Sequence, residues 1–529
     1  MSLILTMLVA MAMALGACTP PTPEPTPDTN GAQTITFDTS NTAIEVGGNV
    51  VTSASTDENG DLTFSVEPAA GMNVLWDDSM DASGDPLTIT DNGDGTYSIV
   101  GASSAAEVYF ISWPKTPSAT PTFTGGGTEI DPYEIADVGD LQQLAADVFG
   151  GNFYEDKYFA LTDNLSLSGF EWLPIGGGAA PPVEEDEKLV PVSFKGFFDG
   201  GGYTISGINY AHDAGEWSKG DSIKNNIGLF GKVDVGASVS NLTINDGSIA
   251  AQRSVGGIVG ESWGTIDNCK NEGVTISASQ TRGTGGIAGS SRIDGTEKPA
   301  STPIISNCTN AASVANTFEQ DSSPSSNARQ SSSASDSEAN EDTSKGGSAG
   351  GIVGENEGLL YNSSNTGAIS STWNAGGLVG SNQNNVQQQK YAPGAEVITL
   401  GLIANSYNAG AVSGVCAGGI VGYQFASAAN VYNYGAVTGT NAGEIIGELN
   451  VDTTDEDITN DYLYYRTGTT VVALDTSGEY NESESGGDFE YSDPDDLVYL
   501  LGLLNTWAGD AGNPYKSWIA GSDEHPTFN

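Results

Sequence analysis

The chain has 529 residues, and its 17 basic against 68 acidic side chains give a formal net charge of −51. A charge of this size and sign keeps a protein soluble and repels nucleic acid and anionic lipid headgroups, so no nucleic-acid partner is expected. Only 16% of the residues are charged and 70 are glycines, which indicates a turn-rich β protein and not an acidic disordered polymer. The length predicts more than one domain.

An apolar run opens the chain, from Leu3 to Ala17, with the length of a signal-peptide core and too short for a comfortable membrane span. It ends in Leu-Gly-Ala before Cys18, which resembles the lipobox of bacterial lipoproteins, although no Lys or Arg precedes the run. That resemblance implies a signal peptide over 1–17, a lipid on Cys18 and attachment to a membrane through that lipid. The alternative is an ordinary cleavage site beside an unrelated cysteine. Residues 18–33 follow as a Pro/Thr-rich linker.

Residues 34–115 predict a small β domain. Short β-rich runs separated by turn signals are typical of an immunoglobulin-like sandwich. A segment from Asp91 to Tyr97 looks like a calcium loop, but it lacks the later ligands and favours a hairpin turn, so no metal site is predicted. Residues 116–126 form a second linker. The predicted strands are 34–37, 43–52, 61–67, 87–90, 96–100 and 107–113.

A phrase of the form Gly-Gly-Ile-Val-Gly recurs five times in the second half, each copy followed by Asn-x-x-Asn. When Gly443 is counted as a degenerate copy, the closest copies are 24 and 26 residues apart. A unit of this size is too short for a propeller blade of about 40 residues and holds roughly three strands, which predicts one coil of a right-handed parallel β-helix. The phrases begin at Gly256, Gly285, Gly350, Gly376 and Gly418, and the Asn pairs are 268/271, 307/310, 362/365, 405/408 and 430/433.

The repeated residues have structural interpretations. Glycines are expected to supply positive φ at the corners of the coil, Ile and Val to fill its core, and the Asn columns to form hydrogen-bonded ladders. Cys269 and Cys308 occupy the same position in consecutive units, where neighbouring coils would bring them within disulfide distance. A disulfide and a pair of buried free thiols both remain open, and Cys416 has no partner in the pattern.

Two amphipathic or apolar segments, 140–149 and 497–507, predict helices that cap the ends of the β-helix, whose open edges otherwise invite aggregation. The first coils and their helix are expected over 127–208, the repeats over 209–450 and a closing segment over 451–529. A Ser/Asp/Glu/Asn-rich insertion at 318–346 predicts disorder. The fold class is therefore all-β, with a sandwich followed by a capped β-helix.

Several segments between 127 and 529 together resemble bacterial GLUG-motif proteins. The resemblance implies a right-handed β-helix on secreted or surface-anchored proteins, many of them adhesin-like and most of unknown activity. Some members are immunoglobulin A-cleaving metallopeptidases, in which the repeats accompany a separate zinc protease domain. The resembling segments are Thr128–Tyr133, Tyr158–Leu161, Trp172–Gly176, Phe194–Gly200, Ile205–Ile208, the repeated Gly-Gly-Ile-Val-Gly and Asn-x-x-Asn units, and Trp518 with His525–Phe528.

Catalytic motifs do not accompany these repeats. The sequence has no His-Glu-x-x-His, no Gly-x-Ser-x-Gly and no P-loop, and its two histidines, His212 and His525, are far apart. A non-enzymatic protein without cofactors or catalytic residues is therefore predicted. The enzymatic alternative is a polysaccharide lyase or hydrolase, because right-handed β-helices also carry that chemistry, which needs paired carboxylates or basic residues with calcium.

Two units are lengthened between the same landmarks, around 290–303 and 381–398, and both insertions would leave the same corner two coils apart. They contain scarce cations and an aromatic residue that could bind anionic glycans: Arg292, Lys298, Lys390 and Tyr391. The alternative is that these are solvent-exposed loops without a ligand. Trp263 and Trp373 could stack on sugars or serve only in loop packing.

The sequence as a whole predicts a bacterial cell-surface lipoprotein that acts as an adhesin or recognition module. We expect it in the bacterial cell envelope, lipid-anchored and surface-exposed, with host or cell-surface glycans or proteins as partners. The other open functions are the carbohydrate-active enzyme and a purely structural surface component.

Overall fold

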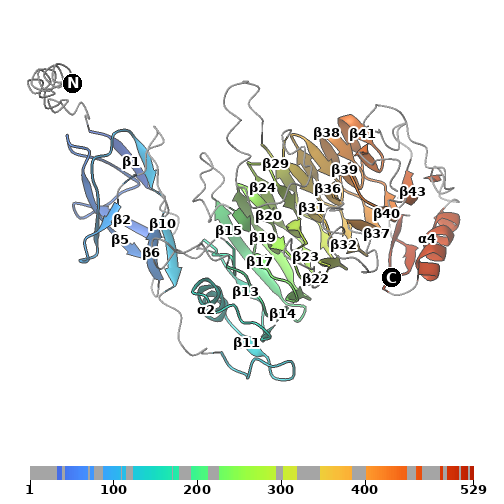
Figure 1. Ribbon diagram of the computed structural model, residues 1–529, viewed down its shortest axis with the longest axis horizontal. Helices are drawn as coiled ribbons and strands as arrows, with labels where there is room; N and C mark the ends of the chain where they lie inside the picture. Colours follow the sequence, from blue (N-terminus) through green and yellow to red (C-terminus); the bar gives the residue numbers. More distant parts are fainter. Residues whose placement is uncertain are drawn as a thin grey trace, which may run out of the picture. The chain divides into compact units, whose positions relative to one another are not determined.

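The computed structural model of the chain is dominated by β-strands in large parallel sheets (Figure 1). The chain divides into two compact units, Met1–Ala70 with Val74–Ser112, and Gly71–Asn73 with Trp113–Asn529. The predicted signal peptide, Cys18 and nearly all of the predicted disordered insertion lie outside the described residues. The structure describes residues 32–37, 42–68, 72–76, 87, 89–108, 110–114, 123–168, 171–177, 192–211, 225–293, 302–318, 346–383, 401–449, 460–466, 489–491, 497–511, 514–521 and 525–529.

The N-terminal part consists of short strands near the predicted positions. One sheet has the order β3-β2-β5-β8-β7, and a second, β4-β1-β9, has β1 and β9 parallel. Side chains from these strands share one buried core that includes Ile35, Ile44 and Phe64. The immunoglobulin-like identity of this part stays a prediction. Its strands are β1 (Thr34–Phe37), β2 (Thr42–Val46), β3 (Asn49–Val50), β4 (Ser53–Ser55), β5 (Leu62–Pro68), β6 (Met72–Trp76), β7 (Ile89–Asp91), β8 (Thr96–Ile99), β9 (Ala106–Val108) and β10 (Phe110–Pro114).

Parallel pairing in register builds the second unit. Each strand of a coil pairs with the equivalent strand one coil later, as Val353, Val379, Val421 and Ile446 do in turn. One 27-stranded and one 7-stranded sheet result, consistent with the predicted β-helix, while its right-handed winding stays a prediction. The first coils contain β11 (Tyr133–Ile135), β12 (Tyr158–Leu161), β13 (Leu165–Ser166), β14 (Phe197–Asp199), β15 (Thr204–Ala211), β16 (Asn225–Ile227), β17 (Phe230–Val233), β18 (Ser238–Ser240) and β19 (Thr243–Ala251).

The repeat coils follow with the same order of strands, and Figure 1 shows them stacked side by side from β19 to β41. Their strands are β20 (Arg253–Gly256), β21 (Val259–Ser262), β22 (Thr265–Asp267), β23 (Lys270–Asn271), β24 (Val274–Ala278), β25 (Gly283–Gly285), β26 (Ala288–Ser291), β27 (Ile304–Ser306), β28 (Thr309–Asn310), β29 (Val314–Asn316), β30 (Ser348–Gly350), β31 (Val353–Asn356), β32 (Leu359–Tyr361), β33 (Ser364–Asn365), β34 (Ile369–Ser371), β35 (Asn374–Gly376), β36 (Val379–Asn382), β37 (Leu402–Asn408), β38 (Val412–Gly418), β39 (Val421–Gln424), β40 (Ala428–Asn433), β41 (Val437–Gly443) and β42 (Ile446–Leu449). The C-terminal strands are β43 (Asn460–Arg466), β44 (Phe489–Tyr491), β45 (Trp518–Ala520) and β46 (Pro526–Phe528).

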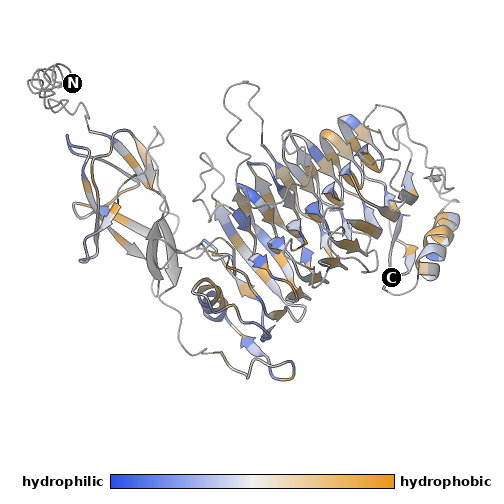
Figure 2. Ribbon diagram, in the orientation of Figure 1, coloured by the Kyte–Doolittle hydropathy of each residue, from blue (hydrophilic) through white to orange (hydrophobic). Residues whose placement is uncertain are grey.

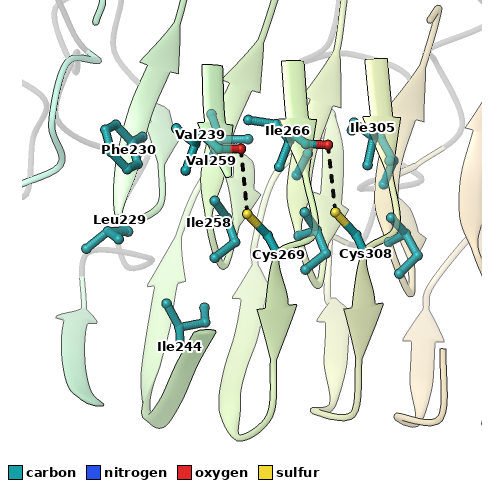
Figure 3. Packing of buried hydrophobic residues seen from close by; sticks show 14 of the residues in the cluster. Leu229, Phe230, Val239, Ile244, Ile258, Val259, Ile266, Cys269, Ile305 and Cys308 are labelled. Atoms are coloured by element: carbon teal, nitrogen blue, oxygen red, sulfur yellow. Dashed lines mark hydrogen bonds between the residues drawn. The ribbon is translucent and has the colours of Figure 1, made fainter. Parts of the chain in front are cut away.

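The core of the column is continuous from the first coil to the last. Hydrophobic residues share its strands with hydrophilic ones (Figure 2), and Ile258, Ile266 and Ile305 are fully buried in one cluster. Neighbouring coils place these side chains one above another, as Figure 3 shows for Ile266 and Ile305. The predicted filling of the core by the repeated Ile and Val positions is confirmed.

The glycines of the repeated phrase have a different role from the predicted one. None of them has a positive φ; each repeat instead has its first asparagine in the left-handed region. A Cβ on Gly354 would lie 2.1 Å from the Thr284 amide nitrogen, and one on Gly260 2.2 Å from the Asn226 carbonyl carbon. Only glycine allows two facing strands to approach this closely, so the phrase marks backbone-to-backbone packing.

The register also corrects the repeat length. Gly443 pairs with Gly418, the first glycine of its phrase, and not with the second, Gly419, as the sequence pattern suggested. Glu444 therefore occupies the position of the second glycine. The shortest coil is 25 residues long, the distance from Gly418 to Gly443.

Both predicted helices are present. Helix α2 (Val138–Phe149) begins at a capping box made by Asp137 and Asp140, and its buried Leu141 and Leu144 join the core of the column. Helix α4 (Leu497–Ala511) instead buries side chains in a separate cluster on the last coils, so its capping role stays a prediction. Within the described part of the chain, neither helix is long and apolar enough to cross a membrane.

Candidate ligand-binding surface

The second asparagine of each repeat forms an inner row inside the coils. Amide nitrogens donate from one coil to the next, at 2.8 Å from Asn365 to Asn408 and 2.9 Å from Asn408 to Asn433. Each amide also closes its own turn: Asn365 donates to the Gly367 carbonyl at 2.9 Å and accepts from the Gly367 amide at 3.1 Å. The predicted ladder is confirmed from Asn310 to Asn433, whereas Asn271 donates to the carbonyls of Val274 and Gly286 instead. Its members, each at most 1% exposed, are Asn271, Asn310, Asn365, Asn408 and Asn433.

The first asparagine of each repeat lies three residues before the second and forms an outer row. Its members adopt left-handed backbone, with φ between 45° and 56°, which Asn tolerates better than most residues. Their amides donate toward the preceding coil, as from Asn405 to Asn362 at 2.8 Å; Asn307 departs from this pattern and donates to Asp267 at 2.6 Å. The row consists of Asn241, which the repeat pattern did not reveal, with Asn268, Asn307, Asn362, Asn405 and Asn430.

The C-terminal segment of the chain lies along the later part of this outer row. We call residues 504–511 and 514–518 the strap. Asparagine amides donate to carbonyl oxygens of the strap, and strap nitrogens donate back to Asn362 and Asn405, while Asn430 Oδ1 is buried without a hydrogen-bond partner. The bonds are Asn430 Nδ2 to Leu504 O (3.2 Å), Asn405 Nδ2 to Lys516 O (3.0 Å), Asn362 Nδ2 to Pro514 O (2.8 Å), Lys516 N to Asn362 Oδ1 (3.0 Å) and Trp518 Nε1 to Asn405 Oδ1 (2.6 Å).

Aromatic contacts hold the strap in the same place. Tyr515 packs on Tyr361 with ring centroids 5.8 Å apart, and Trp518 packs on Tyr407 at 5.9 Å. Equivalent positions on earlier coils carry no aromatic residue; Tyr407 is in register with Ser364, and through it with Thr309, Lys270 and Thr243. The strap therefore ends where the aromatic positions end.

Asparagines 241, 268 and 307 continue the row beyond the strap. Asn268 is exposed and the other two are half-buried. Burial lowers the pKa of the Lys516 amine, the charges of Asp267 and Cys308 raise it, and Lys270 lowers it further. The open part of the row thus carries amides and the Asp267 carboxylate, with Lys270 on the adjacent strand β23 and Lys516 in the strap.

The two aligned cysteines are free thiols. Cys269 and Cys308 are fully buried among Ile and Val side chains, and each sulfhydryl donates to a core carbonyl, from Cys269 to Val239 at 3.7 Å and from Cys308 to Ile266 at 3.8 Å (Figure 3). Burial raises the pKa of the Cys269 thiol well above its ordinary value. The free-thiol alternative is the observed one, and Cys416 is a buried thiol that donates to the Glu448 carboxylate at 2.9 Å.

The predicted insertions leave the column at one corner. The first follows β26 and precedes β27; the second follows β36 and precedes β37, two coils further along. Arg292 forms an ion pair with Glu355 at 2.9 Å, on the strand between the two insertions. Lys298, Lys390 and Tyr391 lie outside the described residues.

Of the two tryptophans proposed as sugar platforms, Trp263 takes part in packing. The Lys232 ammonium lies 3.3 Å from the centroid of the Trp263 ring and 3.0 Å from Glu261. Trp373 donates its backbone N–H to Ser371.

Within the described ranges, no group of three His, Cys, Asp or Glu side chains could hold a metal ion. At the calcium-like segment, Asp94 accepts from Thr96 at the turn between β7 and β8, as predicted.

Sequence comparison identifies one coil directly. The GLUG motif matches residues 251–277, which run from the end of β19 to β24 and include both Asn268 and Asn271. This chain is therefore a GLUG-containing protein.

Two known proteins are similar to larger parts of the chain. Halomucin of Haloquadratum walsbyi (strain DSM 16790 / HBSQ001) is 32% identical over 176 residues, which are 33% of this chain; the chain spans about 2% of the length of that relative. The crystal structure of a Bacteroides ovatus protein proposed to be an immunoglobulin A1 protease covers 79% of this chain and 98% of its own, with 18% identity and a TM-score of 0.40.

Proposed function

We propose that the protein is a bacterial cell-surface lipoprotein, anchored through a lipid on Cys18, that acts as a non-enzymatic adhesin or recognition module. The similarity to halomucin, a mucin by its name, supports a place outside the cell. The repeated residues support a stalk-like role for the column, because their side chains are used in packing and ladders.

The observation that carries this proposal is the shared corner of the two insertions. Coils stack at about 4.8 Å, so the loops after β26 and β36 begin roughly 10 Å apart on one side of the column. Two loops at that distance can contact one ligand together. A rigid column with loops on its side is a suitable scaffold for recognition.

Some charged side chains at this corner are used in ion pairs within the protein, and others are assigned to ligand contact. Arg292 and Arg282 both lie near the buried carboxylate of Glu355, at 2.9 and 3.9 Å, so that carboxylate is compensated. The backbone N–H of Ile293 donates to Glu357 at 3.1 Å, which fixes the start of the first insertion on the next coil. Arg292 thus positions the loop, and we assign ligand contact to Lys298, Lys390 and Tyr391.

A binding array of glycans and matrix proteins tests this proposal with the full-length chain. A Lys298→Ala, Lys390→Ala, Tyr391→Ala triple variant is expected to lose binding about tenfold or more while its melting temperature is unchanged. Asn59→Gly, an exposed substitution in the N-terminal unit, is the matched control. Retained binding by the triple variant contradicts the corner as the site. Release of sugar products from a bound glycan would favour the enzymatic alternative.

A further inference from the structure

The outer asparagine row has a property that the repeats alone do not show: the strap covers its later half and leaves the earlier half open. At Asn362 and Asn405 each amide uses one N–H for the ladder and the other for a strap carbonyl. Asn268 makes the same ladder bond, to Asn241 at 2.8 Å. Among the described residues, nothing accepts its second N–H or donates to its Oδ1.

This open part, which we call the open track, consists of Asn241, Asp267, Asn268 and Asn307. An amide that offers one donor and one acceptor in fixed directions matches a sugar hydroxyl, which both donates and accepts. Asp267 adds an acceptor, since its Oδ1 already binds Ser306 and Asn307 at 2.6 Å, which orients the carboxylate. The column repeats these groups at about 4.8 Å, close to the length of one sugar residue in an extended chain.

An aromatic platform stands at one end of the open track. Tyr361 is in register with Ser306 and Asp267, and it packs against Tyr515. Tyr515 packs in turn on Trp507, with centroids 4.8 Å apart. All three residues are half-buried, so each is partly open to solvent. Aromatic faces beside polar donors are typical of sites for amphipathic ligands such as sugars.

We propose that the open track and this platform bind a neutral polysaccharide chain, laid along the coils with about one sugar per coil. The local charge is mixed: the carboxylates of Asp199 and Asp267 lie beside the amide donors and would repel a uronate or a sulfate, while Lys270 and Lys516 offset them. A chain without charge therefore suits the open track. A peptide fits less well. The aromatic contacts that hold the strap, such as Tyr407 with Trp518, have only Thr or Lys at the equivalent open positions.

Isothermal titration of the full-length chain with neutral hexasaccharides of β-linked glucose, mannose and xylose tests this inference. At least one is expected to bind saturably, and Asn268→Gly and Tyr515→Leu are each expected to weaken it about tenfold. Gly keeps the left-handed backbone available at position 268, and Leu keeps apolar packing at 515. Asn59→Gly is the matched control for a change of the same kind elsewhere.

Three outcomes overturn the inference: no saturable binding of any neutral hexasaccharide, binding that both variants retain within about twofold, or preference for an oligogalacturonate. Binding of a synthetic peptide of residues 510–521 together with the first of these outcomes would show a peptide track instead. The triple variant of Lys298, Lys390 and Tyr391 is expected to bind the neutral sugar normally, so failure of the insertion corner and failure of the open track are distinguishable.

Discussion

The inner and the outer asparagine rows contain the same residue, repeated at the same interval, yet their surroundings differ. The inner row is buried along its whole length, and each amide finds all its partners in its own turn and the neighbouring coils. The outer row has one side open, which the strap fills at Asn362, Asn405 and Asn430 and leaves open at Asn268. A repeated residue therefore has a role set by what covers it, and only the uncovered row can be used for recognition.

Substitution in the inner row is expected to have the largest effect. Asn365→Ala removes four hydrogen bonds at a fully buried site and leaves the Gly367 N–H and carbonyl without partners. Because unsatisfied buried polar groups are costly, we expect a loss of about 3–5 kcal/mol in the free energy of unfolding, measured by urea denaturation. A loss of about 1 kcal/mol or less would show that water replaces the lost bonds and that the inner row is not sealed.

The covered part of the outer row is expected to come second. Asn405→Gly also removes four hydrogen bonds, but two of them join the strap, to Lys516 and Trp518, which can separate from the column and admit water. Glycine keeps the left-handed backbone available. We therefore expect the free energy of unfolding to fall by about 1–3 kcal/mol. Fluorescence quenching is expected to show increased solvent exposure of the Trp518 indole.

If the two substitutions at Asn405 and Asn365 lowered the free energy of unfolding equally, the comparison would be contradicted, because the strap would then exclude water as well as the interior does. An unchanged Trp518 signal would show that the aromatic contacts with Tyr407 alone hold the strap.

The parts of the fold that repeat could be predicted from the sequence. Stacked coils, buried Ile and Val positions, the Asn ladders and the aligned cysteines all follow from residues that recur at a fixed interval, since parallel strands in register place equivalent residues together. The corner shared by the two insertions was predictable for the same reason.

Features without a repeat were not predictable. The close approach of Gly354 to Thr284 depends on the distance between facing strands, which no local pattern contains. The register of Gly443 depends on which of two adjacent glycines on the preceding coil, Gly418 or Gly419, it pairs with. The strap contacts, such as Lys516 with Asn362, join two segments that lie far apart along the chain, and the strap sequence is not part of any repeat. Only the folded structure therefore reveals that the outer row has a covered and an open half.

The open half of the outer row is expected to tolerate substitution best. Asn241 is half-buried and makes two side-chain bonds, to Asp199 at 2.9 Å and from Asn268 at 2.8 Å. Water can replace both, and glycine adopts the left-handed backbone freely, so Asn241→Gly is expected to change the free energy of unfolding by about 0.5 kcal/mol or less. Asn241→Ala controls for the backbone, since alanine in that conformation adds about 1 kcal/mol. If Asn241→Gly were as destabilising as Asn405→Gly, the ladder itself and not the strap would account for stability throughout the row, and the open half would have no spare bonding capacity for a ligand.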